Sequence, residues 1–404
     1  RDIQIGSSGL RLKPEFFAVD FMFVDQTIVP SGSTDMQELS TNQCCDEYLG
    51  SGEDAIMPVH DHDHSASITS ALIKAQTVLR QRYLAKNSRG VTIESPRDMF
   101  CRVATDIALA EPVRQRNKLA RQFYELMASL RFLPNSPTLM NAGRPLQQLS
   151  ACFVLPIEDS LESIFDAVKQ QALIHQSGGG TGFSFSHIRP RGDRVATTNG
   201  LASGPLSFMR LFNQATDVIK QGGTRRGANM GILRVDHPDI QDFISLKTEP
   251  HEMTNFNLSV GLTDRFMRAV RQGRSYSLMN PRTGKLVRQL PAQMIFDRLV
   301  EAAWRSGEPG ILFLDTINRI NPTPHLGLIE ATNPCGEQPL LANESCTLGS
   351  INVARCLTMS HGKAIIDYAQ LAKMIPLAVR FLDDVLDRTR FPLASIESQT
   401  RQTR

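Results

Sequence analysis

Residues 331–340 carry the sequence ATNPCGEQPL, which places an amide, a thiol and a carboxylate at alternate positions. In an extended segment, side chains two residues apart point the same way, so Asn333, Cys335 and Glu337 are expected to face one small site. The proline between them disfavours helix at the preceding residue, and Gly336 permits a sharp bend. The stretch predicts a loop that presents reactive groups, and a plain turn is the alternative for this pattern taken alone.

Two further cysteines strengthen the reactive interpretation. Cys346 lies in NESCTLG, 11 residues after Cys335, and Cys152 lies far upstream in LSACFV. A lone cysteine is most often a small buried hydrophobic residue, so the argument depends on the three together. The chain has seven cysteines, no CxxC spacing and no visible secretory signal, which predicts the reducing cytoplasm and makes any disulfide a transient redox one.

Composition limits the classes of protein. The chain has 404 residues, 41% apolar residues and a net charge of +3, which fits one large domain with an appendage or two domains. This charge gives no case for a nucleic-acid partner or a membrane surface, and no apolar run reaches the roughly 18 residues that span a bilayer. The chain begins with Arg1, which suggests a fragment or an excised product.

Three parts are expected along the chain. Residues 1–65 form an irregular extension, where HDHDH at 60–64 is interpreted as a solvated polar linker, with a divalent-ion site as the alternative. No metal site is assigned. Residues 66–134 form a helical domain, with helices at 67–86, after the capping sequence SPRD at 95–98, and up to Leu130, closed by Pro134.

Residues 135–404 form an α/β domain. NSPTLMNAG at 135–143 is expected to be a small-polar loop, and Asp159-Ser160 to cap a helix whose apolar positions begin Leu161, Ile164 and Phe165. Strands alternate with helices, which favours parallel crossover units. The expected strands are 150–156, 183–188, 230–235, 257–262 and 311–314, and the expected helices are 205–219, 294–304 and 365–386.

Two glycine-rich loops, 177–182 and 220–229, can expose backbone N–H groups to phosphate. The second adds Lys220, Arg225 and Arg226, which suit an anionic ligand. Neither matches a P-loop or a Rossmann fingerprint. Nucleotide or phosphate binding and a mobile surface loop stay open as alternatives.

Six motifs together resemble the catalytic large subunit of ribonucleotide reductases, most closely the adenosylcobalamin-dependent (class II) branch. They are NSPTLMNAG (135–143), SAC (150–152), SGGGTG (177–182), GGTRRGANMG (222–231), NPCGE (333–337) and CTLG (346–349). The sequences PCG (334–336) and RRGANMG (225–231) favour class II. The alternatives are the diiron-dependent class I large subunit and a catalytically incomplete nucleotide-binding fragment.

The resemblance implies reduction of ribonucleotides, expected to be diphosphates, to 2′-deoxyribonucleotides, with adenosylcobalamin starting the radical chemistry. Cys335 would become a thiyl radical and remove the 3′-hydrogen, Glu337 would act as general base, and Asn333 would hold the sugar hydroxyls. Cys152 and Cys346 would supply two electrons by closing a disulfide, which thioredoxin or glutaredoxin would reopen.

The resemblance also implies two nucleotide sites. The substrate would lie along Ser136, Ala151, Cys152, Gly180, Asn333, Pro334, Cys335, Gly336 and Glu337. A dNTP or ATP effector would meet Asp159, Arg189, Lys220, Arg225 and Arg226, near the face of a possible homodimer, and the 222–231 loop would transmit substrate preference.

The fold that the resemblance implies is an α/β barrel of ten strands in two parallel five-stranded halves, preceded by the helical domain. The chain stops after what would be the first half and the reactive loop. No substrate-phosphate loop of the family type and no C-terminal CxxC follow, so the chain is expected to be a fragment lacking the C-terminal half.

Overall fold

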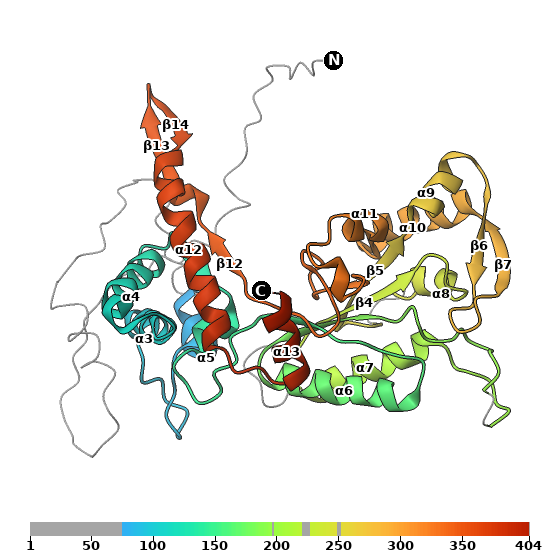
Figure 1. The fold of residues 1–404 in the computed structure, drawn as a ribbon, viewed down its shortest axis with the longest axis horizontal. Helices are drawn as coiled ribbons and strands as arrows, with labels where there is room; N and C mark the ends of the chain where they lie inside the picture. Colours follow the sequence, from blue (N-terminus) through green and yellow to red (C-terminus); the bar gives the residue numbers. More distant parts are fainter. Residues whose placement is uncertain (1–74, 196–197, 220–226, 249–251, 404) are drawn as a thin grey trace. The chain divides into compact units, whose positions relative to one another are not determined.

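The structure is a computed structural model that describes residues 75–195, 198–219, 227–248 and 252–403 (Figure 1). The chain divides into two compact units, Arg1–Met99 and Phe100–Arg404. The predicted ion site or linker at 60–64 lies outside the described residues.

In the described part of the first unit, the helix expected over 67–86 continues as a π-helix, η2 (Leu79–Tyr83). The predicted capping box is confirmed at the start of α3 (Pro96–Ala108), with aspartate in the usual place of glutamate. The Asp98 carboxylate accepts from the Ser95 N–H at 3.0 Å, and the Ser95 hydroxyl oxygen accepts from the Asp98 N–H at 3.2 Å.

Residues from both ends of the second unit build a helical layer. The late helix α12 (Tyr368–Arg388) packs on α4 (Val113–Ala128), and β12 (Gly349–Ile351) pairs antiparallel with β1 (Phe132–Pro134). The buried Phe381 ring lies 5.1 Å from that of Phe123 and 5.4 Å from that of Phe132, centroid to centroid. The helical part of the fold therefore depends on a segment far outside 66–134.

Three predicted boundaries in this layer are wrong. The helix expected to reach Leu130 ends at Ala128, since Leu130 takes a left-handed conformation with φ 54°, and Pro134 belongs to β1. The helix expected from Ile365 begins at Tyr368, because Ile365 lies in β14 (Lys363–Ile366), which pairs with β13 (Leu357–Ser360).

A six-stranded sheet forms the centre of the second unit, in the order β11-β2-β3-β4-β5-β8. The five strands β2, β3, β4, β5 and β8 run parallel, and β11 pairs antiparallel with β2. This is the five-stranded parallel half of an α/β barrel, as predicted. The strands are β2 (Cys152–Val154), β3 (Gly180–Ser184), β4 (Asn229–Arg234), β5 (Phe256–Leu262), β8 (Gly310–Phe313) and β11 (Ser345–Cys346).

Helices and two hairpins, β6–β7 and β9–β10, connect these strands (Figure 1). The elements are α6 (Leu161–Gln176), α7 (Pro205–Ile219), α8 (Ile240–Ile244), α9 (Asp264–Arg271), β6 (Ser275–Met279), β7 (Leu286–Pro291), α10 (Ala292–Ser306) and α11 (Leu314–Arg319). The chain then runs through η3 (Pro324–Leu326), β9 (Ala331–Thr332), β10 (Pro339–Leu340) and η4 (Val353–Cys356), and α13 (Ala394–Thr403) follows α12. The β6–β7 hairpin was not predicted.

The first turn after β1 is helical, although a small-polar loop was expected there. Asn135 caps α5 (Ser136–Asn141) by accepting from the Thr138 N–H at 3.0 Å, and Pro137 lies in the first turn. The cap of α6 was predicted correctly, since the Ser160 hydroxyl oxygen accepts from the Ser163 N–H at 3.1 Å.

The two faces of the sheet differ in what they carry. Strand residues alternate between faces, so Phe153 and Phe183 pack in the core under α6 and α7, which lie along one side of the sheet (Figure 1). Cys152 and Met230 belong to a separate cluster on the other face, together with Ala331 of β9. The second face is the one that bears the candidate site.

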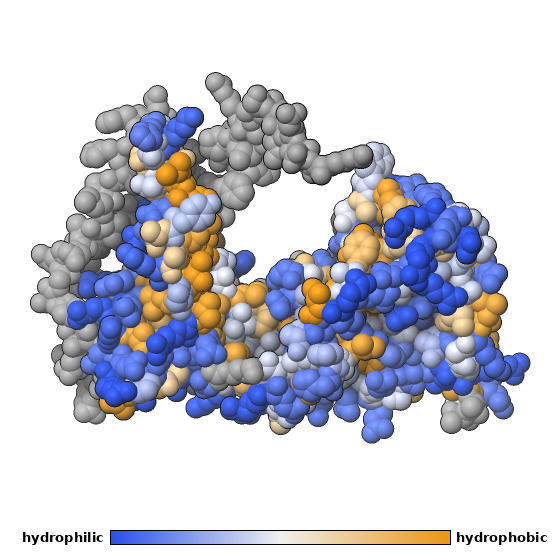
Figure 2. All heavy atoms as spheres, turned by 45° about the horizontal axis from the view of Figure 1, so that its top comes forward, coloured by the Kyte–Doolittle hydropathy of each residue, from blue (hydrophilic) through white to orange (hydrophobic). Residues whose placement is uncertain are grey.

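Apolar side chains are also exposed in several places. Figure 2 shows apolar side chains gathered along α12, where Tyr368 and Val379 are 71% and 59% exposed. The edge strand β8 exposes Ile311 and Phe313, and Trp304 of α10 is 84% exposed. Among the described helices, none is both long and apolar enough to cross a membrane.

Within the helical layer, α12 buries a carboxyl group beside an ion pair. Arg380 binds both carboxylate oxygens of Glu111, and this bond holds the pKa of Glu111 below its usual range. Burial raises the pKa of Asp384 to about 7, and the neighbouring Glu111 charge raises it further than Arg380 lowers it. The protonated form of Asp384 is thus the one that the folded state favours.

We expect Asp384→Asn to increase the free energy of unfolding at pH 8 and to leave it nearly unchanged at pH 4. The pKa of Asp384 is higher in the folded chain, at about 7, than the roughly 4 of an unfolded chain. The stability that this group contributes is therefore complete below pH 4 and is lost as the pH rises through 7. Urea unfolding at both pH values measures the effect, and Asp387→Asn on the exposed side of α12 is the control. An equal effect at both pH values would contradict the assignment.

Candidate active site

The stretch at 331–340 is a short hairpin. Strand β9 pairs antiparallel with β10, and the turn between them is closed by a bond from the Gly336 N–H to the Asn333 carbonyl oxygen at 3.1 Å. Gly336 has φ 85°, a conformation that glycine adopts without strain. The predicted alternation of three side chains on one face is wrong, because the turn breaks the extended backbone. Asn333 is fully buried, whereas Cys335 and Glu337 are exposed.

The glycine-rich stretch at 177–182 supports this hairpin from below. Gly180, Thr181 and Gly182 lie in β3 and are buried, so they do not form the exposed phosphate-binding loop that was considered. A side chain at Gly182 would lie 1.8 Å from the Thr332 carbonyl oxygen, and one at Gly180 would lie 2.6 Å from the Pro334 ring. Only glycine at these two positions allows the hairpin to lie against the strand.

The two cysteines predicted as a pair lie directly opposite each other. Cys346 of β11 is the register partner of Cys152 of β2, both are buried, and their thiols hydrogen-bond to each other. That bond, burial and the negative charge of Glu337 together raise the pKa of Cys346. The arrangement suits two thiols that close a disulfide without a large movement of the backbone.

The turn contacts the sheet on both sides of β3. The Asn333 side-chain amide donates to the Cys152 sulfur at 3.6 Å, and its oxygen accepts from the Gln338 N–H at 3.0 Å. On the other side, the Asn257 amide of β5 donates to the Pro334 carbonyl oxygen at 2.7 Å. The structure therefore brings Asn333, Cys152 and Cys346 together, with Glu337 close enough to act on the thiol pair.

The remaining predicted substrate residues surround the thiol pair. Ala151 is buried, and its N–H donates to the Cys346 carbonyl oxygen at 3.0 Å. Ser136 begins α5, and the preceding Asn135 N–H donates to the Leu348 carbonyl oxygen at 2.8 Å, two residues beyond Cys346. Gly180 lies under Pro334.

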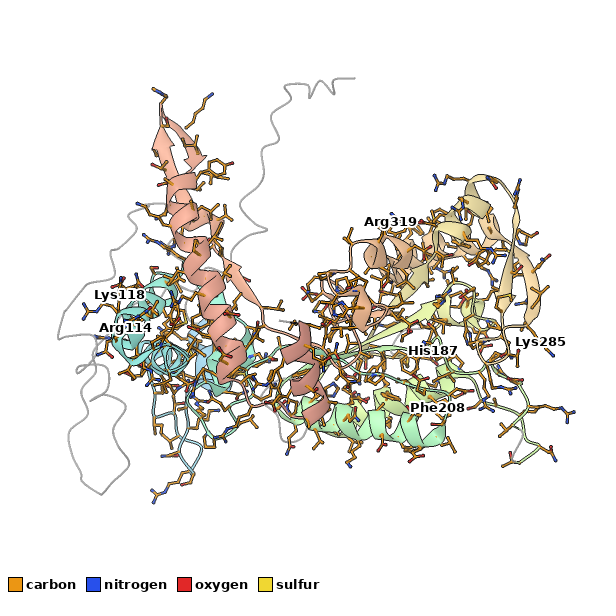
Figure 3. All side chains as sticks on the ribbon, in the orientation of Figure 1. Arg114, Lys118, His187, Phe208, Lys285 and Arg319 are labelled. Carbon is orange, nitrogen blue, oxygen red and sulfur yellow. The ribbon has the colours of Figure 1, made fainter. Side chains whose placement is uncertain are left out.

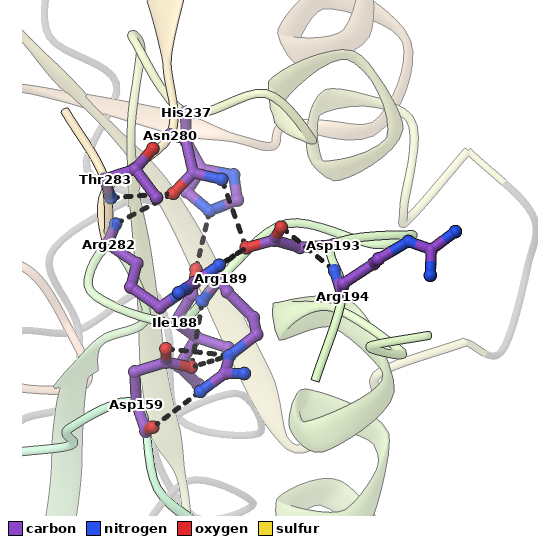
Figure 4. A network of polar contacts seen from close by, with 9 residues as sticks. All are labelled: Asp159, Ile188, Arg189, Asp193, Arg194, His237, Asn280, Arg282 and Thr283. Carbon is purple, nitrogen blue, oxygen red and sulfur yellow. Dashed lines mark hydrogen bonds and ion pairs between the residues drawn. The ribbon is translucent and has the colours of Figure 1, made fainter. Parts of the chain in front are cut away.

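The predicted effector residues Asp159 and Arg189 form an ion pair beyond the carboxyl ends of β2 and β3 (Figure 4). The Arg189 guanidinium Nε donates to both Asp159 oxygens, at 3.0 and 2.8 Å. A second pair lies nearby, with the Arg282 guanidinium 3.0 Å from Asp193. Lys220, Arg225 and Arg226 lie outside the described residues.

An ion pair that no sequence pattern predicted joins the segment before Arg189 to the segment before the hairpin. His187 lies in the turn after β3 (Figure 3). Its imidazole lies 2.7 Å from the carboxylate of Glu330, one residue before β9. The hydrogen bond to Glu330 raises the pKa of His187, and the same bond lowers the pKa of Glu330. The only sequence signal was a histidine after a buried strand, which predicts no partner.

A buried polar network on the helix-facing side of the sheet was also missed. The Asn229 oxygen accepts from the Thr181 hydroxyl at 2.7 Å and from the Gln171 amide at 3.1 Å, and its own amide donates to the Thr216 hydroxyl at 3.0 Å. His175 contacts Thr181 at 3.1 Å, and burial lowers its pKa to about 4. The spacing of four between Gln171 and His175 on the buried face of α6 was the available signal.

Comparison with known proteins identifies the family. The model of the barrel domain of ribonucleotide reductase matches residues 150–404, and that of its all-alpha domain matches residues 73–147. The chain belongs to the ribonucleotide reductase family.

Curated ribonucleotide reductases align with most of this chain. The vitamin B12-dependent ribonucleoside-diphosphate reductase of Mycobacterium tuberculosis is 52% identical over 336 residues, which cover 82% of this chain and 48% of the relative. The protein of the same name from Thermoplasma acidophilum is 46% identical, covering 82% and 50%. The ribonucleoside-diphosphate reductase large subunit of vaccinia virus is 30% identical, covering 81% and 45%. The chain spans about half the length of these relatives.

We expect Gly182→Ala to displace the hairpin at 331–340 from the sheet, because the added methyl group would lie 1.8 Å from the Thr332 carbonyl oxygen. Overpacking of this kind costs about 1–3 kcal/mol of folding stability. The thiols of Cys152 and Cys346 should then react faster with a thiol reagent, measured by mass spectrometry of labelled peptides. Gly200→Ala is the control, since its methyl group meets only the Thr198 hydroxyl at 3.3 Å. Equal labelling in both variants would contradict the role of Gly182.

Proposed function

We propose that this chain carries the reactive-loop half of a vitamin B12-dependent ribonucleoside-diphosphate reductase, which replaces the 2′-hydroxyl of a ribonucleotide by hydrogen. One observation carries the proposal. Cys152 and Cys346 face each other at the foot of the hairpin that presents Cys335. Three sulfurs from distant parts of the chain thus lie in one region, as the two-electron chemistry of the family requires.

The relatives favour the B12-dependent branch over class I. The two relatives with 52% and 46% identity are named vitamin B12-dependent reductases, and the vaccinia virus large subunit is 30% identical. The first two names also specify a ribonucleoside diphosphate as substrate. Production of deoxyribonucleotides for DNA synthesis follows from that assignment.

Three residues of the hairpin act on the sugar in this proposal. Cys335, as a thiyl radical, removes the 3′-hydrogen, and Glu337 accepts the proton of the 3′-hydroxyl. Both side chains are exposed, so a substrate lying over the turn can reach both. Asn333 lies buried between them and the thiol pair, where its amide orients the sugar hydroxyls relative to Cys152.

The thiol pair supplies the electrons. Loss of the 2′-hydroxyl as water consumes two electrons and two protons, and Cys152 and Cys346 provide both as they close a disulfide. Thioredoxin or glutaredoxin, as a dithiol, then reopens it and is itself oxidised. We place this cycle in the cytoplasm, because the pair must be kept reduced between turnovers.

The cofactor in this proposal is adenosylcobalamin, which supplies, when bound, the radical that no ordinary side chain can start. The exposed position of Cys335 fits this requirement. Cys335 is therefore the residue that we assign to meet the cofactor.

The substrate lies over the inner face of the sheet. We assign to it the start of α5 at Ser136, the Ala151 backbone beside Cys346, and Gly180 under Pro334.

We propose a separate effector site for dNTP or ATP at Asp159 and Arg189. These side chains already lie together, so a nucleotide can meet the carboxylate through its ribose and the guanidinium through its phosphates. Lys220, Arg225 and Arg226 are assigned to the same nucleotide from the sequence alone.

Two assemblies complete the proposal. α6 exposes Leu161, Phe165 and Leu173, at 65%, 54% and 41%, which suits a homodimer contact near the effector site. The edge strand β8, with Ile311 and Phe313 exposed, suits pairing with the second half of a ten-stranded barrel. The length of the relatives, about twice the matched region, supports such a second half.

We expect Cys335→Ser to abolish reduction of ribonucleoside diphosphate in the presence of adenosylcobalamin, because serine cannot form the thiyl radical. Effector affinity, measured by calorimetry, should change less than about twofold, since Asp159 and Arg189 lie elsewhere. Cys356→Ser is the matched control, being a buried thiol outside the hairpin. Both variants are compared in this chain and in a full-length protein that contains it. Effector binding without reduction in the full-length wild type would instead support a nucleotide-binding function without chemistry.

We expect Cys152→Ser to allow at most one turnover when thioredoxin is the reductant, because no disulfide can close between positions 152 and 346. The product formed per protein in a rapid-quench experiment measures this. Sustained thioredoxin-driven turnover in the variant would exclude the pair as the electron source.

A further inference from the structure

The side-chain amide of Asn333 has a fixed orientation. Its oxygen accepts from the Gln338 N–H at 3.0 Å, and the same two residues share a backbone bond of 3.2 Å from the Asn333 N–H. Exchanging the amide oxygen and nitrogen would set the NH₂ group against a backbone N–H. The NH₂ group must therefore point to the Cys152 sulfur, 3.6 Å away, in a fully buried setting.

The two thiols of the pair consequently have different surroundings. The Cys152 sulfur lies against the N–H of Asn333 as well as the thiol of Cys346. Cys346 lies near the carboxylate of Glu337, whose negative charge, with burial and the contact to Cys152, raises its pKa. Donors stabilise a thiolate, whereas burial and a nearby carboxylate destabilise one.

We propose that the Asn333 amide makes Cys152 the more acidic thiol of the pair, so that an external thiol opening the Cys152–Cys346 disulfide attacks Cys346 and expels Cys152. The inference rests on the redox pair of the proposed function. It assigns Asn333 a positioning role on sulfur in addition to its role on the sugar.

Reduction of the Cys152–Cys346 disulfide then proceeds in two exchange steps. The attacking thiolate forms a bond to the Cys346 sulfur as the disulfide bond breaks, and the electron pair of that bond leaves on Cys152. In thiol–disulfide exchange, the sulfur of the more acidic thiol leaves faster. The second thiol of the reductant then attacks the mixed disulfide, releases Cys346, and leaves the reductant oxidised by two electrons. Two protons, from the dithiol, end on the pair.

Mapping of the mixed disulfide tests the proposal without any need for turnover. The chain is first oxidised with a mild oxidant and then exposed briefly to glutathione. Acid quenching and peptide mass spectrometry locate the glutathione. We expect at least about tenfold more glutathione on Cys346 than on Cys152. Equal labelling, or labelling mainly of Cys152, overturns the proposal. Failure of the Cys152–Cys346 disulfide to form at all refutes the redox pair of the proposed function, and this inference with it.

Two variants distinguish the effect of the Asn333–Cys152 hydrogen bond from the effect of unequal access of the reagent to the two sulfurs. Asn333→Ala removes the donor to Cys152 and should reduce the preference for Cys346 to less than about threefold. Asn257→Ala is the matched control, because it removes a hydrogen bond of 2.7 Å from the sheet to the same turn and leaves the contact of Asn333 with sulfur in place. A loss of preference in both variants would show that only the anchoring of the hairpin matters, and would overturn the proposal.

A direct titration covers the case in which Asn333→Ala disturbs the fold. In Cys346→Ser, the Cys152 thiol remains beside Asn333 without its partner. The pH dependence of its reaction with iodoacetamide should shift upward by at least about one pH unit when Asn333→Ala is added. An unchanged profile in the double variant, with unchanged circular dichroism, overturns the role of Asn333.

Discussion

The close packing of the hairpin at 331–340 on the backbone of β3 organises the site. The Thr332 carbonyl oxygen lies where a side chain of residue 182 would begin, and Pro334 lies over residue 180 in the same way. Because alternate residues of a strand face the same side, two glycines two apart leave the inner face of β3 without side chains from Gly180 to Gly182. Larger residues flank this cleared strip, with Cys152 on β2 and Met230 on β4. The hairpin packs on these glycines, and in this position the Asn333 amide contacts the Cys152 sulfur.

The alternation of side chains along each strand places the reactive residues on one face of the sheet and the core residues on the other. Cys152 faces the hairpin, while the next residue, Phe153, packs in the core beneath α6 and α7. In β3, Thr181 points away from the hairpin into a network with Asn229 and His175. Buried polar groups are costly unless they are hydrogen-bonded, so these bonds favour one register of strand against helix. The position of the inner face thus depends on bonds made on the outer face.

Local signals in the sequence predicted local structure well. The caps at Ser95 and Ser160, the strand around Cys152 and the helix from Pro205 were all confirmed, because each depends on residues within a few positions of one another. The turn at 333–336 was not predicted, since a Pro-Cys-Gly sequence is compatible with both an extended and a folded backbone, and the hydrogen bonds across the hairpin decide between them.

Contacts between distant segments were beyond any local signal. The pairing of Cys152 with Cys346 was expected only from the resemblance, since no periodicity specifies which strand lies beside β2. The packing of α12 on α4 was missed for the same reason. The helix α5 was missed although its cap is local, because the Asn135 oxygen accepts from the Thr138 N–H only three residues away. The resemblance, carried by six short motifs in order, supplied the three-dimensional information that composition and periodicity lacked.

The ion pair of His187 with Glu330 is a further contact between distant segments. His187 lies two residues before Arg189, and Glu330 lies directly before the strand that leads into the reactive turn. Backbone bonds hold the sheet beneath them in one register, whereas a side-chain pair can change its geometry at small cost. The raised pKa of His187 means that the pair is charged below that pKa and weakens as the pH rises through it. The pair therefore links the turn that leads to Arg189 to the residue before β9 through a side-chain contact of 2.7 Å.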